Sequence, residues 1–145
     1  RLVICSPYLE STEPYVVNDV VRLSAHGTFN LLGRYDDVVK VEEKRVSLVE
    51  IENHLSKHDS VEDQAVTLVE LNQRQVIVAV IALGQGDSRC ARHLKEEWRQ
   101  VLLQYFDPVV VPRHYIVVEK LPRNEQGKIQ RQLLEDIIFE SAFVN

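Results

Sequence analysis

Extended apolar runs, which predict β-strands, occupy the middle of the chain and part of its C-terminal half. Residues 61–71 and 75–83 are rich in Val and Ile, and the polar residues 72–74 between them predict a hairpin connection. Residues 113–118 form another β-branched run. Residues 38–46 predict a shorter hairpin with a strongly charged turn. The central and C-terminal parts of the chain therefore contain the strands of a small sheet and one separate hairpin.

Three other segments place apolar residues every three or four positions, which is the spacing of an amphipathic helix. Ser47 followed by Glu50 is a capping-box pattern, and the helix that it starts is expected to end near His58. Asp87 or Ser88 can cap the second helix. The apolar positions of the three helices are Leu48, Ile51 and Leu55, then Ala91, Leu94, Trp98, Val101, Leu102 and Tyr105, then Leu133, Leu134, Ile137 and Ile138.

The first 33 residues have a different character from the rest of the chain. Their apolar runs are short and predict three strands with few partners of their own, and a sheet of that size is marginal by itself. The predicted fold class is therefore α+β. We expect a β-hairpin and a roughly three-stranded sheet flanked by helices, preceded by three strands that belong elsewhere.

Composition and charge narrow the classes of function. A chain of 145 residues fits one domain, or one domain with a piece of another. Hydrophobic residues make up 45% and charged residues 27%, as in ordinary globular proteins, and no apolar run approaches the roughly 18 residues of a membrane span. The net charge of −5 argues against a duplex nucleic-acid surface. Anionic ligands would have to be bound by local clusters of cations.

The cysteine and methionine content bears on the cellular compartment of the protein and on whether the chain is a complete translated product. Cys5 and Cys90 are too few for a disulfide framework, and no signal peptide pattern precedes them, so we expect a reducing, cytoplasmic location. The chain begins at Arg1 and contains no Met. We therefore expect it to be a piece of a longer translated product.

The strongest candidate for chemistry is the polar loop that runs from Leu121 to Arg131. Gly127 permits a positive φ or a close backbone approach, and Lys128 carries a mobile charge on a long side chain. Such a lysine can meet a phosphate or a carboxylate in a site that another surface completes, although a solvated surface lysine is the commoner role for this residue type. The Gly-Lys pair is not a P-loop, because the upstream glycine is absent.

A second candidate lies at the change from the short N-terminal strands to the rest of the chain. Arg34 is a fixed cation whose planar donors suit phosphate or ribose oxygens. Asp36 and Asp37 form a polar turn directly before an apolar extended run. Taken alone, this pattern is a charged turn.

Other residues that can carry chemistry have ordinary structural interpretations. His54 and His58 lie four apart on a predicted helix and could share a metal ion, but no third ligand is evident, so we expect exposed helix histidines and no metal site. Cys90 shows no paired base and is expected to be an idle thiol. Trp98 lies within an apolar stripe and is expected to anchor the core.

The segment around Arg34 and the loop around Lys128 resemble two signatures of the adenylate-forming enzymes, which include acyl-CoA synthetases, luciferases and peptide-synthetase adenylation enzymes. The first is similar to the segment that joins their two domains, and the second to their final signature of Leu-Pro-Arg, Gly-Lys and a following Arg. Val111-Pro112 and residues 116–119 are also similar, so the resemblance covers nearly the whole chain. Asn18-Asp19 departs from the family's Thr-Gly-Asp element and keeps only the Asp.

The resemblance implies an architecture and a reaction. Residues 1–35 would be the C-terminal edge of a large nucleotide-binding domain, and residues 36–145 would be the small mobile C-terminal domain. The N-terminal strands should then make few core contacts with residues 37–140. Family members form an acyl-adenylate from a carboxylic acid and ATP with Mg²⁺, and then a thioester on coenzyme A or on the phosphopantetheine of an acyl carrier protein. The fragment alone should be inactive, because the large domain holds the phosphate loop and the acid pocket.

The resemblance also implies roles for individual residues. Lys128 would contact the acyl carboxylate and the α-phosphate during adenylation, Asp19 and Arg34 would contact the ribose or phosphates, and Asp36 would be the hinge. Because a flexible cation between two anions stabilises the charge that develops, replacing Lys128 by Ala in the full-length enzyme should slow adenylation by on the order of a hundredfold. Thioester formation from a supplied adenylate should survive.

One departure from the family concerns the turn between Lys40 and Arg45, where a glycine is common and this chain has Glu43. By resemblance this turn, with Arg45, faces the pantetheine tunnel during thioester formation. Glutamate adds bulk and negative charge beside an incoming thiolate, and if the turn keeps a positive φ it also costs about 1 kcal/mol of strain. We therefore expect poor use of free coenzyme A, with either a carrier protein as acceptor or a weakened second half-reaction.

The function that the resemblance implies is part of an AMP-forming acyl- or aryl-acid ligase. Two alternatives remain open at this point: an adenylation enzyme that serves an acyl carrier protein, and a non-catalytic protein-binding or regulatory module with the same fold. The acid cannot be predicted, because its pocket would lie in the large domain.

Overall fold

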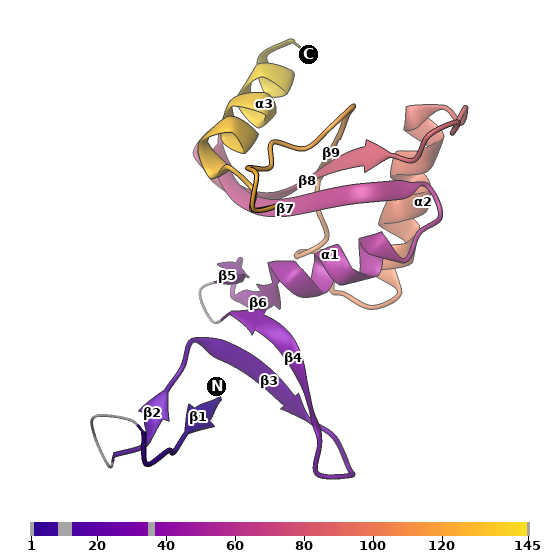
Figure 1. The fold of residues 1–145 in the computed structure, drawn as a ribbon. Coiled ribbons are helices and arrows are strands. Elements are labelled where there is room, and N and C mark those ends of the chain that lie inside the picture. Colours follow the sequence, from indigo (N-terminus) through magenta and orange to yellow (C-terminus); the bar gives the residue numbers. More distant parts are fainter. Residues whose placement is uncertain (1, 9–12, 35–36, 145) are drawn as a thin grey trace.

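The computed structural model describes residues 2–8, 13–34 and 37–144, and within these ranges the predicted α+β class is confirmed (Figure 1). Short strands alone make up the N-terminal part, which Figure 1 shows in indigo and violet below the rest of the molecule. The second part contains all three helices of the described chain and a three-stranded sheet.

The N-terminal part consists of two antiparallel two-stranded ladders. β1 (Val3–Ile4) pairs with β2 (Tyr15–Val16), and β3 (Asp19–Leu23) pairs with β4 (Phe29–Arg34). The sequence predicted three strands here, but the chain bends at Asn18 and so separates β2 from β3. Many large apolar side chains of this part are exposed, namely Val3, Ile4, Tyr8, Tyr15, Val16, Leu23, Phe29 and Leu31.

A hairpin and a helix follow. β5 (Val38–Val41) and β6 (Lys44–Ser47) pair antiparallel through a two-residue turn, and α1 (Leu48–Ser56) begins directly after β6. The backbone N–H of Glu50 donates to the Ser47 hydroxyl at 3.3 Å, which confirms the predicted N-terminal cap.

The main sheet has three strands in the order β7-β8-β9. β7 (Val61–Leu71) and β8 (Arg74–Leu83) are antiparallel, whereas β9 (His114–Val118) lies parallel to β8. The turn between β7 and β8 contains Asn72 and Gln73, one residue fewer than predicted, because Arg74 already pairs with the end of β7.

Helices cover both faces of this sheet, as predicted. α2 (Ala91–Leu103) connects β8 to β9, since parallel neighbours need a crossover, and α3 (Arg131–Val144) follows the loop after β9 (Figure 1). Trp98 of α2 is fully buried, which confirms it as a core anchor, and its Nε1–H donates to the hydroxyl of buried Ser60 at 3.0 Å. One core cluster includes Ile51, Leu55, Ile81, Leu94, Trp98 and Leu102, and the other includes Val69, Val78, Val80, Leu121, Leu134 and Ile138.

The start of α2 differs from the prediction. Its N-cap is Cys90, an exposed free thiol whose side chain makes no capping hydrogen bond. Asp87, one of the expected caps, instead pairs with the guanidinium of Arg89 at 2.7 Å and accepts the Arg89 N–H at 3.0 Å. The hydrogen bonds from Arg89 lower the pKa of Asp87 to about 2. The expectation of an Asp87 or Ser88 cap was wrong, because the loop between β8 and α2 uses Asp87 internally.

The N-terminal strands lie outside both core clusters. Among the described residues, none before Val39 belongs to either cluster or packs against it. The two parts meet where β4 approaches α1, and Arg22 forms an ion pair with Glu50 there at 3.6 Å. The core of the described chain is therefore built by the second part alone.

Candidate functional site

The loop that carries Lys128 is folded around the side chain of Asn124. The Asn124 carboxamide oxygen accepts the N–H groups of Gln126 at 2.9 Å and Lys128 at 3.0 Å, and the Asn124 N–H donates to the Lys128 carbonyl oxygen at 2.9 Å. Gly127 has a φ of 79°, a left-handed conformation that side chains rarely adopt. The Lys128 residue itself is exposed. This arrangement fixes the backbone while leaving the lysine side chain in solvent.

Arg123 ties this loop to the main sheet. Its Nε and one terminal nitrogen donate to the two carboxylate oxygens of Asp63 on β7, each at 2.7 Å, in a bidentate pair. Its other terminal nitrogen donates to the Gly127 carbonyl oxygen at 2.7 Å. Arg123 was visible in the sequence only as part of the Leu-Pro-Arg signature. Its partner lies 60 positions away, and no local pattern pointed to it.

Further charged residues lie between this loop and the segment that precedes β5. Arg131 approaches Asp37 at 3.7 Å, and the carboxylate of Glu52 on α1 accepts a backbone N–H of β7 at 2.8 Å. Burial is the main cause of a raised pKa at Glu52, and the carboxylates of Asp37 and Asp63 raise it further. The hydrogen bond from β7 and the guanidinium of Arg123 act in the opposite direction.

Asp19 and Arg34, the two predicted nucleotide-binding residues, lie directly opposite each other in the β3–β4 ladder. Fifteen positions separate them in the sequence, and strand pairing brings them together at the end of the hairpin. The Asp19 carbonyl oxygen accepts the N–H of Leu2 at 2.9 Å, which connects this end to the first strand region. Asp36, the predicted hinge, lies outside the described residues.

The turn between β5 and β6 is formed by two glutamates in the left-handed region. Glu42 has a φ of 45° and Glu43 a φ of 70°. Two-residue hairpin turns with both φ values positive match the twist of the strands, but they favour Gly, Asn or Asp. Glu43 therefore occupies a position that costs a non-glycine residue about 1 kcal/mol. Its carboxylate pairs with Lys40 of β5 at 3.0 Å.

Arg45 lies beside this turn, opposite Lys40 in the β5–β6 ladder. It is one of the residues that line a shallow depression of about 410 Å³, together with Tyr105 and Phe106 after α2. The predicted site residues that the structure describes therefore lie in three places: the end of the β3–β4 hairpin, the β5–β6 turn and the loop before α3. A reaction that uses residues from all three places would require either a surface from another domain or a movement that brings these places together.

His54 and His58, predicted as exposed helix histidines, are less exposed than predicted. His54 stacks on Tyr105 with 4.3 Å between ring centroids, and burial is the main cause of its lowered pKa. The His58 side chain is 14% exposed, with Nδ1 at 2.8 Å from the Ser60 hydroxyl and Nε2 at 3.2 Å from Glu97. The expectation of exposed helix histidines was wrong: His54 packs against the segment that follows α2, and His58 lies beyond the end of α1 at Ser56, where it contacts Glu97 of α2. Within the described ranges, no three His, Cys, Asp or Glu side chains gather as metal ligands.

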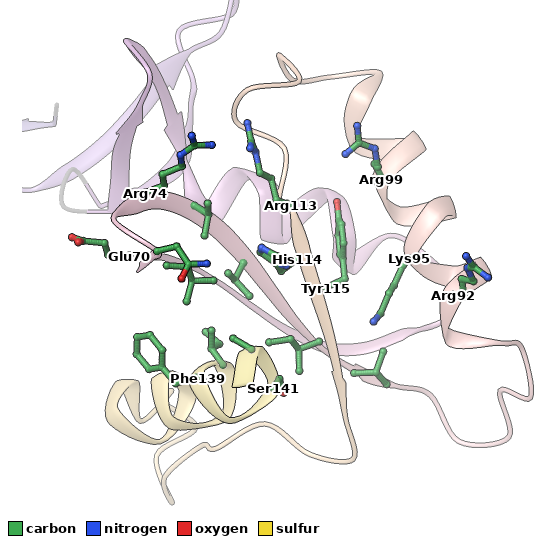
Figure 2. Close-up of a pocket in the computed structure, with 18 of the residues that line it drawn as sticks. Glu70, Arg74, Arg92, Lys95, Arg99, Arg113, His114, Tyr115, Phe139 and Ser141 are labelled. Carbon is green, nitrogen blue, oxygen red and sulfur yellow. The ribbon is translucent and has the colours of Figure 1, made fainter. Parts of the chain in front are cut away.

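A groove of about 1350 Å³ runs along β9 between α2 and α3 and was not predicted from the sequence (Figure 2). Figure 2 shows Arg92, Lys95 and Arg99 projecting from α2 on one side of β9, while Phe139 and Ser141 of α3 lie on the other side. None of the predicted site residues lines this groove.

Several known proteins are similar to this chain in sequence and in fold. The model of the AMP-binding enzyme C-terminal domain matches residues 50–128. Acetyl-coenzyme A synthetase of Mycobacterium bovis is 34% identical over 124 residues, which are 85% of this chain and 19% of that protein. Human mitochondrial malonate–CoA ligase is 38% identical over 110 residues, 74% of this chain and 18% of that protein. A crystal structure of a benzoate CoA ligase from Burkholderia xenovorans has a TM-score of 0.70 at 30% identity, and the match covers 84% of this chain and 24% of that chain.

These matches confirm the class that the two sequence signatures indicated, which is that of the adenylate-forming enzymes. Within this class, the chain belongs to the family of AMP-binding enzyme C-terminal domains. It spans less than a fifth of the length of the two curated relatives named above. None of the helices in the described part of the chain has the length and apolarity to cross a membrane.

Proposed function

We propose that this chain is the C-terminal part of an AMP-forming carboxylic-acid ligase, which activates an acid as its adenylate and passes the acyl group to a thiol. The main support for the proposal is the Lys128 loop, which lies at the end of the family match. Hydrogen bonds from Arg123 and to Asn124 hold its backbone in place. A backbone held in this way presents one long cation at a defined position, which suits a site completed by another domain.

We assign residues 1–35 to the edge of a larger nucleotide-binding domain and residues 36–145 to the small mobile domain, with Asp36 as the hinge. The exposed apolar side chains of β1 to β4 support this division, because strands of this kind are stable only when a neighbouring sheet covers them. A rotation of the small domain would need only a few backbone torsions at the junction.

The cations of this chain suit the chemistry of adenylation. Attack of a carboxylate on the α-phosphate of ATP brings two anions together, and Lys128 would stabilise both during the reaction. Arg34 and Asp19, which share one end of the β3–β4 hairpin, would contact the phosphates and the ribose. ATP supplies the adenylyl group, and we assign Mg²⁺ mainly to the larger domain and the nucleotide phosphates.

The acceptor is either coenzyme A or the phosphopantetheine of an acyl carrier protein. From the β5–β6 turn we expect poor use of free coenzyme A, with either a carrier protein as acceptor or a weakened second half-reaction. In the thioester-forming pose Glu43 and Arg45 would face the pantetheine arm. Glu43 keeps a positive φ and adds a carboxylate where a side-chain-free residue would let the arm pass. We place the reaction in a reducing compartment such as the cytoplasm, because both cysteines are free thiols.

The experiment that tests this function compares Lys128→Ala with Lys120→Ala in the full-length enzyme. Lys120 is an exposed lysine on the same loop region and makes no ion pair with a described residue, so it is a matched control. ATP–pyrophosphate exchange with a panel of carboxylic acids should fall by about a hundredfold in the Lys128 variant and stay unchanged in the control. Thioester formation from a supplied acyl-adenylate should survive in both variants.

Two results would contradict the proposal. If the parent enzyme supports no pyrophosphate exchange with any acid in the panel, it is not a ligase of this class. If Lys128→Ala slows both half-reactions equally, Lys128 has a folding role and not the proposed contact with the reacting groups. The 145-residue chain alone should show no exchange.

A further inference from the structure

The open edge of β9 lines the groove between α2 and α3. β9 pairs with β8 on one side only and is the last strand of the sheet. Five consecutive residues, 113–117, line the groove, whereas a strand that exposes one face would contribute alternate residues only. The N–H of Arg113 donates to the Ile77 carbonyl oxygen of β8 at 3.1 Å. Strand alternation therefore directs the backbone N–H and C=O groups of His114 and Ile116 away from β8, toward the groove.

The two walls of the groove differ in chemistry. Arg92, Lys95 and Arg99 project from α2 on one side of β9, as Figure 2 shows. The opposite wall and the floor are mostly apolar, and they consist of Val76, Val78, Ile116, Ile138, Phe139 and Ala142. A segment lying along β9 would meet cations on one of its faces and apolar side chains on the other.

Charge is concentrated here in a protein whose net charge is −5. Five cations line the groove, against the two carboxylates of Glu70 and Glu96, and the cations are Arg74, Arg92, Lys95, Arg99 and Arg113. None of these five makes an ion pair with another residue in the part of the chain that the structure describes, whereas Arg89, Arg123 and Arg131 each do.

A buried polar atom points to the same place. Tyr115 of β9 lines the groove, its residue is 7% exposed, and its hydroxyl has no hydrogen-bond partner among the described residues. A buried hydroxyl without a hydrogen-bond partner is energetically unfavourable. Figure 2 shows this hydroxyl on the side of the groove where Arg99 and Arg113 lie.

We propose that the groove binds an extended, acidic segment of a partner protein, which adds to β9 as a fourth strand of the sheet. The edge groups of His114 and Ile116 would pair with the backbone of the segment. Because side chains alternate along a strand, its acidic residues would face the α2 wall and its apolar residues would face the α3 wall. The preferred sequence is therefore an alternation of Glu or Asp with Val, Ile or Leu. This surface is separate from the residues to which the ligase function is assigned.

The first test uses two peptides of the same composition and the intact 145-residue chain. One is a fluorescently labelled peptide that alternates four Val with three Glu, and the other carries the same residues as a Val block and a Glu block. The alternating peptide should bind at least about tenfold more tightly in fluorescence anisotropy, because only it can satisfy both walls as a strand. Its binding should slow the exchange of the His114 and Ile116 amides, measured by NMR.

The second test separates specific docking from general attraction. Arg92→Glu combined with Arg99→Glu should weaken binding of the alternating peptide by about tenfold or more, because two attractive contacts become repulsive. Lys57→Glu combined with Lys120→Glu changes the net charge by the same amount at exposed positions outside the groove, and should have a much smaller effect. A version of the peptide with N-methyl groups on alternate residues should lose binding, because it cannot complete the edge hydrogen bonds.

Three outcomes would overturn the proposal. Equal binding of the alternating and block peptides would mean that no strand register exists. Equal loss in the two charge-reversed variants would mean non-specific attraction to cations. Concentration-dependent self-association of the chain that protects the same two amides would mean that β9 pairs with a second copy and not with an acidic partner. Circular dichroism of each variant checks that the fold is intact before binding is measured.

Discussion

The two parts of this chain use apolar side chains in opposite ways. In residues 37–144, Trp98 and Ile81 are completely buried in one of the two core clusters. In residues 2–34, Leu23 is 79% exposed and Leu31 is 61% exposed, although both lie in regular strands. Hydrogen-bonded pairing alone therefore does not make a core. The comparison separates a part that buries its own apolar side chains from strands whose apolar side chains remain exposed.

The strongest test of this comparison removes one apolar side chain from each part. Trp98→Ala should destabilise the chain by about 3–5 kcal/mol, because it leaves a large cavity in the core. Leu31→Ala should cost less than about 0.5 kcal/mol, since the side chain is already in water. Urea denaturation followed by circular dichroism measures both. A large effect of Leu31→Ala would show that the N-terminal strands belong to the same cooperative unit.

The ion pairs of the two parts provide a second comparison. Arg123 and Asp63 form a bidentate pair within the second part, with side chains about one-third exposed, whereas Arg22 reaches across to Glu50 at 3.6 Å with 64% of its side chain exposed. A double-mutant cycle for Arg123→Ala and Asp63→Ala should give a coupling free energy of about 1 kcal/mol.

The corresponding double-mutant cycle for Arg22→Ala and Glu50→Ala should give a coupling free energy near zero. Arg123→Ala should also speed amide exchange at Gly127 and Lys128, measured by NMR, because Gly127 loses its hydrogen bond from Arg123 and the loop loses its link to Asp63 of β7. Unchanged exchange at these amides would mean that Asn124 alone holds the loop.

An effect of similar size is expected from the strained β5–β6 turn. Glu43→Gly should stabilise the chain by about 1 kcal/mol, because glycine adopts a positive φ without steric cost. Lys40→Ala, which removes only the ion pair to Glu43, should leave stability nearly unchanged and serves as the control. In the full-length enzyme, Glu43→Gly should raise coenzyme A-dependent turnover while pyrophosphate exchange stays the same. Fast coenzyme A turnover before the substitution would contradict the proposed poor use of free coenzyme A.

The smallest predicted effect is a pH dependence that comes from Glu52. Its pKa is raised in the folded chain above the ordinary value of 4.5, mainly by burial. The folded state therefore holds this proton more tightly than the unfolded state does, and stability falls as the pH rises from 4.5 through the folded pKa. Glu52→Gln keeps an acceptor for the β7 N–H and removes this loss.

Thermal unfolding should show Glu52→Gln to be the more stable protein at pH 7, with the difference vanishing near pH 4. A difference that is the same at both pH values would mean that the substitution acts through packing and not through the charge of Glu52. The N-terminal part offers no comparable buried carboxylate among the groups with a resolved pKa shift.

The sequence was sufficient to predict structure that depends on neighbouring residues. It was not sufficient to predict features that depend on contacts between distant parts of the chain. Val- and Ile-rich runs and the Ser47 cap were sufficient to predict the main sheet and the first helix, because periodicity and capping act within a few residues. The Arg123–Asp63 pair and the packing of His54 on Tyr105 depend on the crossing of distant elements. The groove along β9 also depends on how two helices are placed, which no pattern in either helix encodes.

The bracing of Lys128 has a mechanical consequence for the proposed ligase. Arg123 links the lysine loop to Asp63 of β7 through two hydrogen bonds of 2.7 Å. The lysine loop and the sheet would therefore move as one rigid body when the small domain rotates. The lysine would then leave the reacting atoms by displacement alone, without any refolding of the loop. The rotation angle of the small domain would then set the distance between Lys128 and the reacting atoms. The conformation of the lysine loop would stay the same from one turnover to the next.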